Sequence, residues 1–288
     1  MASFSKGFAK LARLNYFKYS PDLVVVGGNG FVGSAICKVA AQCGLTSVSL
    51  SINPAPPVYS MDDTHDSSWV SHVQWRHGDA TDPKTWDAHV VEAGCTAMIY
   101  TAKPFNRSEK YLWDCNYVGA LKSIDMARKM KANRFVYIST NFLPPLTSQS
   151  ERETKKKAEE ALMEYSRLSL ETDNPISLSI LKPGWVYGEG HISSSIVGAP
   201  LHVLHDHFRL SNSSRNLSSI SVDTLALAAA CQAFDAELEP VLKLYNNDMR
   251  VYEDPAAREW LVQTAKRIYN LKQASHTAYD YEAYSSVS

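Results

Sequence analysis

The sequence predicts an α/β fold, a doubly wound parallel sheet with a small C-terminal α/β extension. Short apolar runs alternate along the chain with longer segments of helical periodicity, an order typical of parallel sheets covered by helices on both faces. The first apolar run is followed directly by regularly spaced glycines. Hydrophobic residues make up 45% of the 288 residues, which is enough to bury a sizeable core.

The predicted strands are short runs of apolar and β-branched residues. Their continuous apolar character indicates burial on both faces, as in a parallel sheet. In chain order we predict strands at Leu23–Val26, Ser47–Ile52, Val73–Arg76, Ala97–Thr101, Phe135–Ser139, Ser177–Lys182 and Leu242–Tyr245.

The predicted helices carry apolar residues three or four positions apart. Gly44 ends the first one, and Asp254-Pro255 opens the last with an N-cap and a proline at the first helical position. The polar tail from residue 274 is expected to be an extended arm. The helices are predicted at Ser34–Cys43, Tyr117–Met130, Glu151–Glu171, Val222–Phe234 and Pro255–Lys272.

Composition excludes several classes of protein. The 29 basic and 30 acidic residues give a net charge of −1, which argues against non-specific nucleic-acid binding. The longest apolar run, Leu225–Cys231, is far shorter than the ~20 residues of a membrane helix. The cysteines show no pairing pattern, so we interpret them as reduced thiols. They are Cys37, Cys43, Cys95, Cys115 and Cys231.

The first twenty residues are basic and contain no acid; the first acidic residue is Asp22. Such a basic, serine-containing start is typical of an organelle presequence. A basic amphipathic helix that stays on the mature protein and docks on a partner or a lipid surface explains it equally well. Both readings favour mitochondria. The bases Lys6, Lys10, Arg13 and Lys18 are interleaved with Phe4, Phe8, Leu11 and Phe17.

The strongest functional signal is VVVGGNGFVG, residues 24–33. Gly27, Gly30 and Gly33 lie between a predicted strand and a predicted helix. Glycines there permit a tight turn and close approach of a pyrophosphate, and a helix N-terminus offers N–H groups and a positive dipole end. We expect Phe31 and Val32, at that helix start, to be binding residues as well. The alternative is a tight turn kept for packing, without a ligand.

This turn resembles the glycine motif of the extended and atypical short-chain dehydrogenase/reductases, which have a Rossmann sheet. Further motifs resemble that family in the same order, and together they cover roughly residues 20–235. They are HGDATD (77–82), MIYTAKP (98–104), NYVGALKSIDMARK (116–129), FVYIST (135–140), LKPGWVYG (181–188) and ISVDTLA (220–226).

The resemblance implies an NAD(P)-binding site and roles for individual residues. Asp79, with Ala80 next to it, falls where the family hydrogen-bonds the adenine. Thr101 and Ala102 fall on the nicotinamide side, as does Pro183. Ser139, or its neighbour Thr140, falls where the family has its active-site hydroxyl.

The end of the second strand bears on the choice of dinucleotide. An NAD site usually has a carboxylate there that accepts hydrogen bonds from the ribose hydroxyls. Here the segment reads Ser49-Leu50-Ser51-Ile52-Asn53, so no acid repels a 2′-phosphate and no arginine binds one. Ser51 and Asn53 can hydrogen-bond either ribose. The sequence therefore favours NADP(H) over NAD(H).

The family's catalytic tyrosine is missing. SERETKKKAEEAL (150–162) resembles the family segment Y-x-x-x-K-x-x-A-E, which places its lysine at Lys155 and its tyrosine at Glu151. A carboxylate, ionised near neutral pH, does not act as the phenol does. For Lys155, contact with the ribose and a solvated helix face paired with Glu151 remain as alternatives. We expect dinucleotide binding without turnover by the usual mechanism.

His202, His205 and His207 raise a metal hypothesis, but their spacing does not put all three on one helix face, so we expect no metal site. The serine-rich loop Glu189–Leu217 falls where the family builds its substrate pocket, and its composition identifies no substrate.

The domain organisation predicted is a basic segment (1–20), a dinucleotide-binding core (21–190), a region like a substrate lobe (191–273) and a polar tail (274–288). The chain resembles the dehydrogenase-like accessory subunit of respiratory complex I and related proteins of coenzyme Q biosynthesis. The resemblance implies a non-catalytic subunit of a large mitochondrial complex on the matrix side of the inner membrane, with peripheral membrane contact. An active reductase or epimerase, and a sensor of dinucleotide redox state, are the alternatives.

Overall fold

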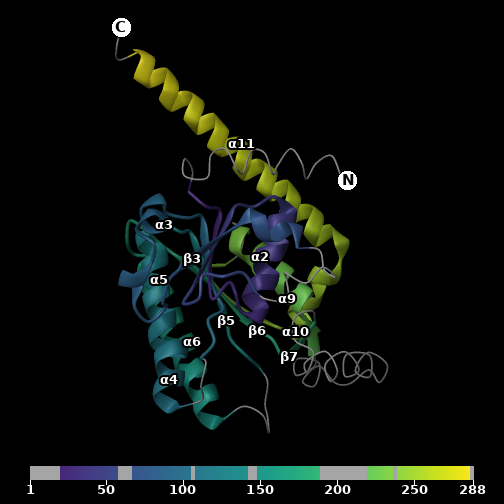
Figure 1. The fold of residues 1–288 in the computed structure, drawn as a ribbon. Helices are drawn as coiled ribbons and strands as arrows, with labels where there is room; N and C mark the ends of the chain where they lie inside the picture. Colours follow the sequence, from purple (N-terminus) through teal and green to yellow (C-terminus); the bar gives the residue numbers. More distant parts are fainter. Residues whose placement is uncertain are drawn as a thin grey trace.

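The computed structural model describes residues 20–57, 67–104, 108–141, 148–188, 219–235 and 239–285. Its centre is a seven-stranded parallel sheet with the order β3-β2-β1-β4-β5-β6-β9, and helices cover both faces (Figure 1). The predicted doubly wound α/β class is confirmed. The strands are β1 (Leu23–Val26), β2 (Ser47–Ser51), β3 (Val73–His77), β4 (Ala97–Tyr100), β5 (Arg134–Ile138), β6 (Ser177–Lys182) and β9 (Val241–Tyr245).

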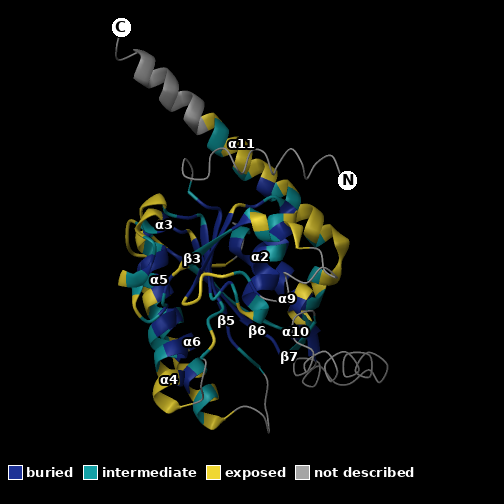
Figure 2. Ribbon diagram, in the orientation of Figure 1, coloured by how far each residue is buried: buried dark blue, intermediate teal, exposed yellow. Residues whose placement is uncertain are grey.

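Two hydrophobic cores lie on opposite faces of this sheet. One is covered by α2 (Phe31–Cys43), α9 (Val222–Phe234) and the first half of α11 (Pro255–Ser285). The other is covered by α3 (Ala88–Ala93), α5 (Ala120–Lys129) and α6 (Gln149–Ser169). The inner strands are buried between these layers, whereas the edge strands β3 and β9 are partly exposed (Figure 2).

Shorter elements connect the layers. A second, two-stranded parallel sheet pairs Trp185–Tyr187 with Ser219–Ser221 beyond the end of β6. These elements are β7 (Trp185–Tyr187), β8 (Ser219–Ser221), α4 (Glu109–Trp113), α10 (Asn246–Met249), the 3₁₀ turns η2 (Ser68–His72), η3 (Pro83–Thr85) and η5 (Arg250–Glu253), and the π-helical segment η4 (Asp114–Gly119).

The sequence of β1 and β2 explains how the two faces are built. All four residues of β1 are apolar and buried, with Leu23 and Val25 in one core and Val24 and Val26 in the other. In β2, Val48 and Leu50 face the core under α5, whereas the intervening residues are small serines. Because serine occupies little volume, the chain after β1 can approach this strand closely.

Two helical predictions need correction. The helix expected from Tyr117 includes the π-helical segment 114–119, and regular α-helix begins only at Ala120. The extended conformation expected for the tail after residue 274 is wrong, because α11 continues to Ser285 and projects beyond the body of the protein (Figure 1). Neither glycine nor proline occurs between residues 256 and 285, so nothing in the chain interrupts the helix.

An ion pair at the N-terminal edge of the sheet holds α11 in place. The buried Asp22 carboxylate accepts a hydrogen bond from the Thr46 amide and another from the Thr46 hydroxyl, both at 2.7 Å. Its other oxygen lies 2.6 Å from Lys272 Nζ on α11, and that ammonium also donates to the Ser20 carbonyl at 2.6 Å. The start of the fold and its last helix are therefore linked through one carboxylate.

Replacing this lysine tests the link. Lys272→Met leaves the Asp22 charge buried without its cation, so the free energy of unfolding should fall by about 1–3 kcal/mol, with the Thr46 hydrogen bonds limiting the loss. Arg267→Met, at an exposed position of the same helix, should change it by less than ~0.5 kcal/mol. Chemical denaturation measures both; equal effects would show that the pair contributes nothing.

Candidate functional site

The glycine turn after β1 lies where the strand order reverses, between β1 and β4. In open α/β sheets, ligands bind at this switch point. Gly27 has a φ of +84° and donates its N–H to the Leu50 carbonyl at 2.7 Å. A Cβ at Gly27 would lie 2.8 Å from the Ala102 backbone. No other residue type is compatible with both the conformation and the space.

The two later glycines differ in what surrounds them. A Cβ at Gly33 would lie 2.2 Å from the Gly27 carbonyl oxygen, so Gly33 permits the start of α2 to pack on the turn. A Cβ at Gly30 would lie 3.3 Å from that oxygen, and Gly30 is exposed. Gly30 is the N-cap of α2 and provides no side-chain cap, so the first-turn amides can accept an anion as their partner. The first two helical residues, Phe31 and Val32, pack on the core under α2.

The end of β4 lies against the turn. Thr101 donates its N–H to the Val26 carbonyl at 2.9 Å, and its hydroxyl lies 2.9 Å from the Val26 carbonyl oxygen and 3.1 Å from that of Gly27. Ala102 follows, directly against Gly27. The structure therefore brings together the glycine turn and the two residues predicted from the β4 motif.

The residues predicted at the end of β2, Ser51 and Asn53, lie beside the turn and are hydrogen-bonded to Asn29. The buried Ser51 hydroxyl accepts a hydrogen bond from the Asn29 amide at 3.3 Å, and Asn29 Nδ2 donates to the Asn53 carbonyl at 2.7 Å. The neighbouring strand ends at His77, whose exposed ring contacts the Ile52 carbonyl at 2.9 Å. The sequence analysis did not identify Asn29 or His77 at this position.

Asp79 lies in the loop after β3. One carboxylate oxygen accepts hydrogen bonds from the Thr81 amide (2.7 Å) and hydroxyl (2.8 Å), and the Asp79 carbonyl accepts from Trp86 Nε1 at 2.8 Å. This carboxylate therefore shapes its own loop. Ala80, next in the chain, is buried, and a Cβ at Gly119 would lie 3.3 Å from its side chain.

Lys155 differs from the two lysines that follow it on α6. Burial lowers its pKa; Glu151 and Cys115 oppose this shift, and Lys103 from the end of β4 adds to it. Lys156 instead pairs with Glu160 at 3.9 Å, and Lys157 lies 5.4 Å from the centre of the Trp113 ring. The solvated face therefore belongs to Lys156 and Lys157, while Lys155 lies toward the interior beside the end of β4.

Glu151 occupies the first turn of α6, where its N–H donates to the hydroxyl of the N-cap Ser148 at 3.2 Å. A carboxylate is favoured at a helix N-terminus by the helix dipole. Glu151 and Lys155 are coupled electrostatically, as expected for residues four positions apart. Glu151, which we align with the family's tyrosine, therefore places a carboxyl group at the N-terminus of α6.

A buried polar contact that the sequence analysis missed joins α6 to the π-helical segment. Asn116 Nδ2 donates to the Thr154 hydroxyl at 3.2 Å, and the Asn116 carbonyl accepts from the Tyr137 hydroxyl at 3.3 Å. Burial raises the pKa of Tyr137 well above its usual range, so this phenol stays protonated. The signal was available in NYVGALKS, as an asparagine within an otherwise apolar helix, and π-helical turns occur frequently at functional sites.

Ser139, the candidate active-site hydroxyl at the end of β5, is hydrogen-bonded to a buried carboxylate. It donates to Glu159 Oε1 at 2.5 Å. The same buried carboxylate binds Lys182 Nζ at 2.6 and 2.7 Å and lies 3.8 Å from Lys243 Nζ. The pair Ala158-Glu159, on which we aligned the family motif, thus connects α6 with β5, β6 and β9.

The remaining predicted site residues lie at the end of β6 or later in the chain. The Pro183 carbonyl accepts from the Asn141 amide at 2.7 Å, and the next amide, of Gly184, donates to the buried Asn246 side chain at 2.8 Å. These two hydrogen bonds connect the end of β6 to the segment after β5 and to α10. His202, His205 and His207, and the whole loop 189–217, lie outside the described residues.

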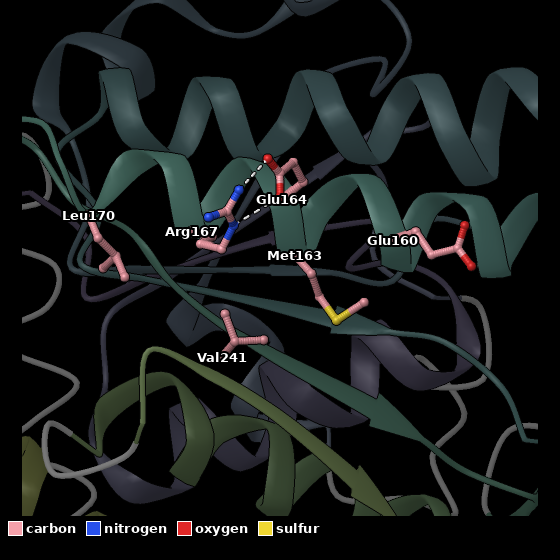
Figure 3. Close-up of a pocket in the computed structure, with 6 residues that line it drawn as sticks. All are labelled: Glu160, Met163, Glu164, Arg167, Leu170 and Val241. Carbon is pink, nitrogen blue, oxygen red and sulfur yellow. Dashed lines mark hydrogen bonds and ion pairs between the residues drawn. The ribbon is translucent and has the colours of Figure 1, made fainter.

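Other features of the described residues add no second site of this kind. They contain no cluster of three metal-ligating side chains, and no described helix is long and apolar enough to cross a membrane. All five cysteines are buried and form no disulfide with one another, and their reduced state stays a prediction. A hollow of about 430 Å³ on the outer surface of α6, beside β9, is lined by Met163, Leu170 and Val241 and by charged residues of α6 (Figure 3).

The lowered pKa of Lys155 predicts a pH-dependent effect on stability. Because its charged form is disfavoured in the folded state, the penalty is present at pH 7, and stability rises as pH increases toward the ordinary pKa of lysine. Lys155→Met should therefore raise the free energy of unfolding at pH 7, and the difference from the unmodified chain should shrink at pH 10. Denaturant titrations at both pH values measure it.

Lys156→Met provides the matched control. This exposed lysine makes only a 3.9 Å pair with Glu160, so its removal should change stability by less than ~0.5 kcal/mol at either pH. A Lys155→Met protein that is less stable than this control at pH 7 would contradict the assignment of a desolvated ammonium.

Comparison with protein families and curated proteins places this geometry in context. The family model described as the NAD dependent epimerase/dehydratase family matches residues 23–195. The chain is 30% identical over 236 residues to "Uncharacterized protein At1g32220, chloroplastic" of Arabidopsis thaliana, covering 80% of this chain and 73% of that protein. It is 31% identical over 91 residues to MIOREX complex component 2 of Saccharomyces cerevisiae, covering 32% of this chain and 31% of that protein.

Solved structures share the fold at low sequence identity. 3-Hydroxyacyl-CoA dehydrogenase type-2 from Mycobacterium avium aligns with a TM-score of 0.59 at 12% identity, covering 81% of this chain and 97% of that one. The Bordetella bronchiseptica enzyme WbmG, solved in complex with NAD and UDP, aligns with a TM-score of 0.53 at 12% identity, covering 85% and 79%. The resemblance to short-chain dehydrogenase/reductases is confirmed: the chain belongs to the NAD dependent epimerase/dehydratase family.

Proposed function

We propose that this protein binds a nicotinamide dinucleotide, NADP(H) in preference to NAD(H), and acts without catalysis as a subunit of a mitochondrial assembly. One observation carries the proposal. The turn at Gly27–Gly33 brings the N-terminus of α2, which has no side-chain cap, to the switch point of the sheet, and Glu151, which we align with the family's proton-transferring tyrosine, lies in the first turn of α6.

The diphosphate would lie at the N-terminus of α2, beside Gly30, Phe31 and Val32, where the Gly30 N–H donates to the Gly27 carbonyl at 3.1 Å. Thr101 and Ala102 lie against Gly27 and would border the nicotinamide half. When bound, the nicotinamide supplies a hydride donor or acceptor. Further contacts with the dinucleotide are proposed for Ser51, Asp79, Ala80, Lys155 and Pro183.

The preference for NADP(H) rests on the end of β2. The residues near the predicted ribose, Ser51, Asn53 and Asn29, carry hydroxyl and amide groups and no carboxylate, so no charge at these residues repels a 2′-phosphate. Membership of an NAD dependent family supports a nicotinamide dinucleotide of either kind.

Two features support the absence of turnover by the family's usual mechanism: the carboxyl group of Glu151 in place of a phenol, and the hydrogen bond of the Ser139 hydroxyl. Glu151 has no phenolic proton to donate, and its negative charge faces Lys155 in place of a hydroxyl. Ser139 donates its hydroxyl to Glu159, so this candidate hydroxyl is directed to a carboxylate. A bound dinucleotide would then stabilise the fold, by ~2.7 kcal/mol at a hundred times its Kd.

Membership of an organellar assembly is supported by the basic composition of the first twenty residues and by the names of two relatives. The yeast relative is named as a component of the MIOREX complex, and the Arabidopsis relative is named chloroplastic. The first twenty residues are basic and free of acids, as in an organelle-targeting or docking segment. We propose the matrix side of the inner membrane as the location, with respiratory complex I as the specific assembly.

A second candidate is an active NAD(P)-dependent reductase or epimerase-like enzyme, including one in coenzyme Q biosynthesis. The lowered pKa of Lys155 beside the end of β4 favours this candidate, because perturbed lysines occur frequently at active sites. It requires another acid in place of the tyrosine.

Substitution of Gly30 tests dinucleotide binding. Aspartate is a good N-cap and fits the backbone, since Gly30 has a φ of −76°. Gly30→Asp should therefore fold normally yet weaken NADP(H) binding at least ~tenfold, because its charge opposes the diphosphate at the helix N-terminus. Gly30→Asn has nearly the same shape without the charge and should bind more tightly than Gly30→Asp.

Calorimetry with both dinucleotides measures these affinities. Tighter binding of NAD(H) would reject the NADP(H) preference. Equal affinities of the Asp and Asn variants, or no binding by the unmodified protein, would reject the phosphate site.

Native-gel migration and turnover assays distinguish the two candidates. The endogenous protein should migrate with a very large complex, and the purified protein should not oxidise NADPH with small carbonyl or quinone substrates. Migration as a free dimer would reject the assembly role. Turnover that Glu151→Ala abolishes would show that Glu151 is an acid of an active enzyme.

A further inference from the structure

A groove between the start of α9 and the start of α11 has the character of a peptide-binding surface. It has a volume of about 1100 Å³. Its apolar lining includes Leu227, Val262 and Trp260, the last 38% exposed. Its charged lining residues are Asp223, Glu253, Asp254, Glu259 and Arg258. The start of α11 is exposed along this surface (Figure 2).

The groove is predominantly acidic. Four of its lining residues are carboxylates and one is an arginine, and Arg258 Nη1 donates to Gln42 of α2 at 3.2 Å. The hollow on α6 is less acidic, because its charged lining residues are two carboxylates, Glu160 and Glu164, and Arg167 (Figure 3). An acidic groove with exposed aromatic surface suits a basic segment that contains aromatic residues.

The chain supplies such a segment close by. Residues 1–19 contain Lys6, Lys10, Arg13 and Lys18 and no acid, and Phe4, Phe8, Leu11 and Phe17 alternate with these bases. Ser20, the residue that follows, accepts a hydrogen bond from Lys272 of α11 at 2.6 Å. The segment therefore joins the fold beside the same helix that lines the groove.

The segment is long enough to reach the groove. Lys272 lies 13 positions beyond Glu259 on α11, which corresponds to about 20 Å of helix at ~1.5 Å per residue. Nineteen residues span about 28 Å as a helix and about 60 Å when extended. Both lengths exceed the distance along α11.

We propose that residues 1–19 dock on their own chain in the acidic groove formed by α9, η5 and α11. The phenylalanines and Leu11 would cover Trp260, Leu227 and Val262, and the lysines would lie among the carboxylates. This interaction does not depend on dinucleotide binding. It assigns the basic segment a site on the folded protein and makes α11 the surface that receives it.

Cross-linking of the full-length chain tests this docking. A zero-length carbodiimide reagent should join Lys6 or Lys10 to Glu253, and trypsin should cleave slowly after Lys10 and Arg13. The variant Asp223→Asn/Glu259→Gln retains Glu253 but removes two exposed charges. Tryptic cleavage after Lys10 and Arg13 should become about fivefold faster, because the loss of two exposed ion pairs weakens docking by about that factor. Added salt at ~0.5 M should have a similar effect on the unmodified chain.

The matched control is Glu160→Gln/Glu164→Gln, which removes two charges from the hollow on α6; it should leave both the cross-links and the cleavage rate unchanged. Mixing ¹⁵N-labelled and unlabelled chains separates links within a chain from links between copies. Links only between copies would overturn the proposal in favour of a second copy as occupant. Failure to detect links to Glu253, or equal cleavage of both double variants, would overturn it as well.

Discussion

The close approach of the β4 end to the glycine turn is the constraint on which the rest of the site depends. Thr101 and Ala102 lie against Gly27, and Gly33 lies against the Gly27 carbonyl. Since none of these contacts leaves room for a Cβ on Gly27 or Gly33, the backbone of β1, β4 and α2 converges at one place. That convergence places the start of α2, which has no side-chain cap, at the switch point of the sheet.

The two sides of the proposed site have different chemistry. On the proposed phosphate side, the contacts would come from backbone N–H groups, which do not depend on side-chain identity. On the proposed nicotinamide side, polar side chains interact with one another: Ser139 with Glu159, Asn116 with Thr154, and Glu151 electrostatically with Lys155. A site that binds a dinucleotide while lacking a phenol for proton transfer is consistent with this division.

Local sequence patterns predicted the elements that depend on local interactions. β6 and α9 match the predicted residues Ser177–Lys182 and Val222–Phe234, because a buried apolar run and a well-capped apolar helix are both visible in a short window. The glycine turn was equally visible. That the glycine turn and the other candidate residues bind a dinucleotide stays a prediction.

Other features depend on pairs distant in sequence. The links Asp22–Lys272 and Glu159–Lys182 join residues 250 and 23 positions apart, and no local pattern indicates which partner a buried carboxylate will have. The tail was expected to be extended because its composition is polar, yet α11 continues through it without a glycine or proline to end it.

The most direct test of the account is an experimental density map of protein isolated from its native source. The account predicts density for a dinucleotide whose diphosphate lies within hydrogen-bond distance of the amides of residues 30–33. A map in which a side chain of the protein fills that position, or in which the crevice is empty while the protein is in its native assembly, would contradict it.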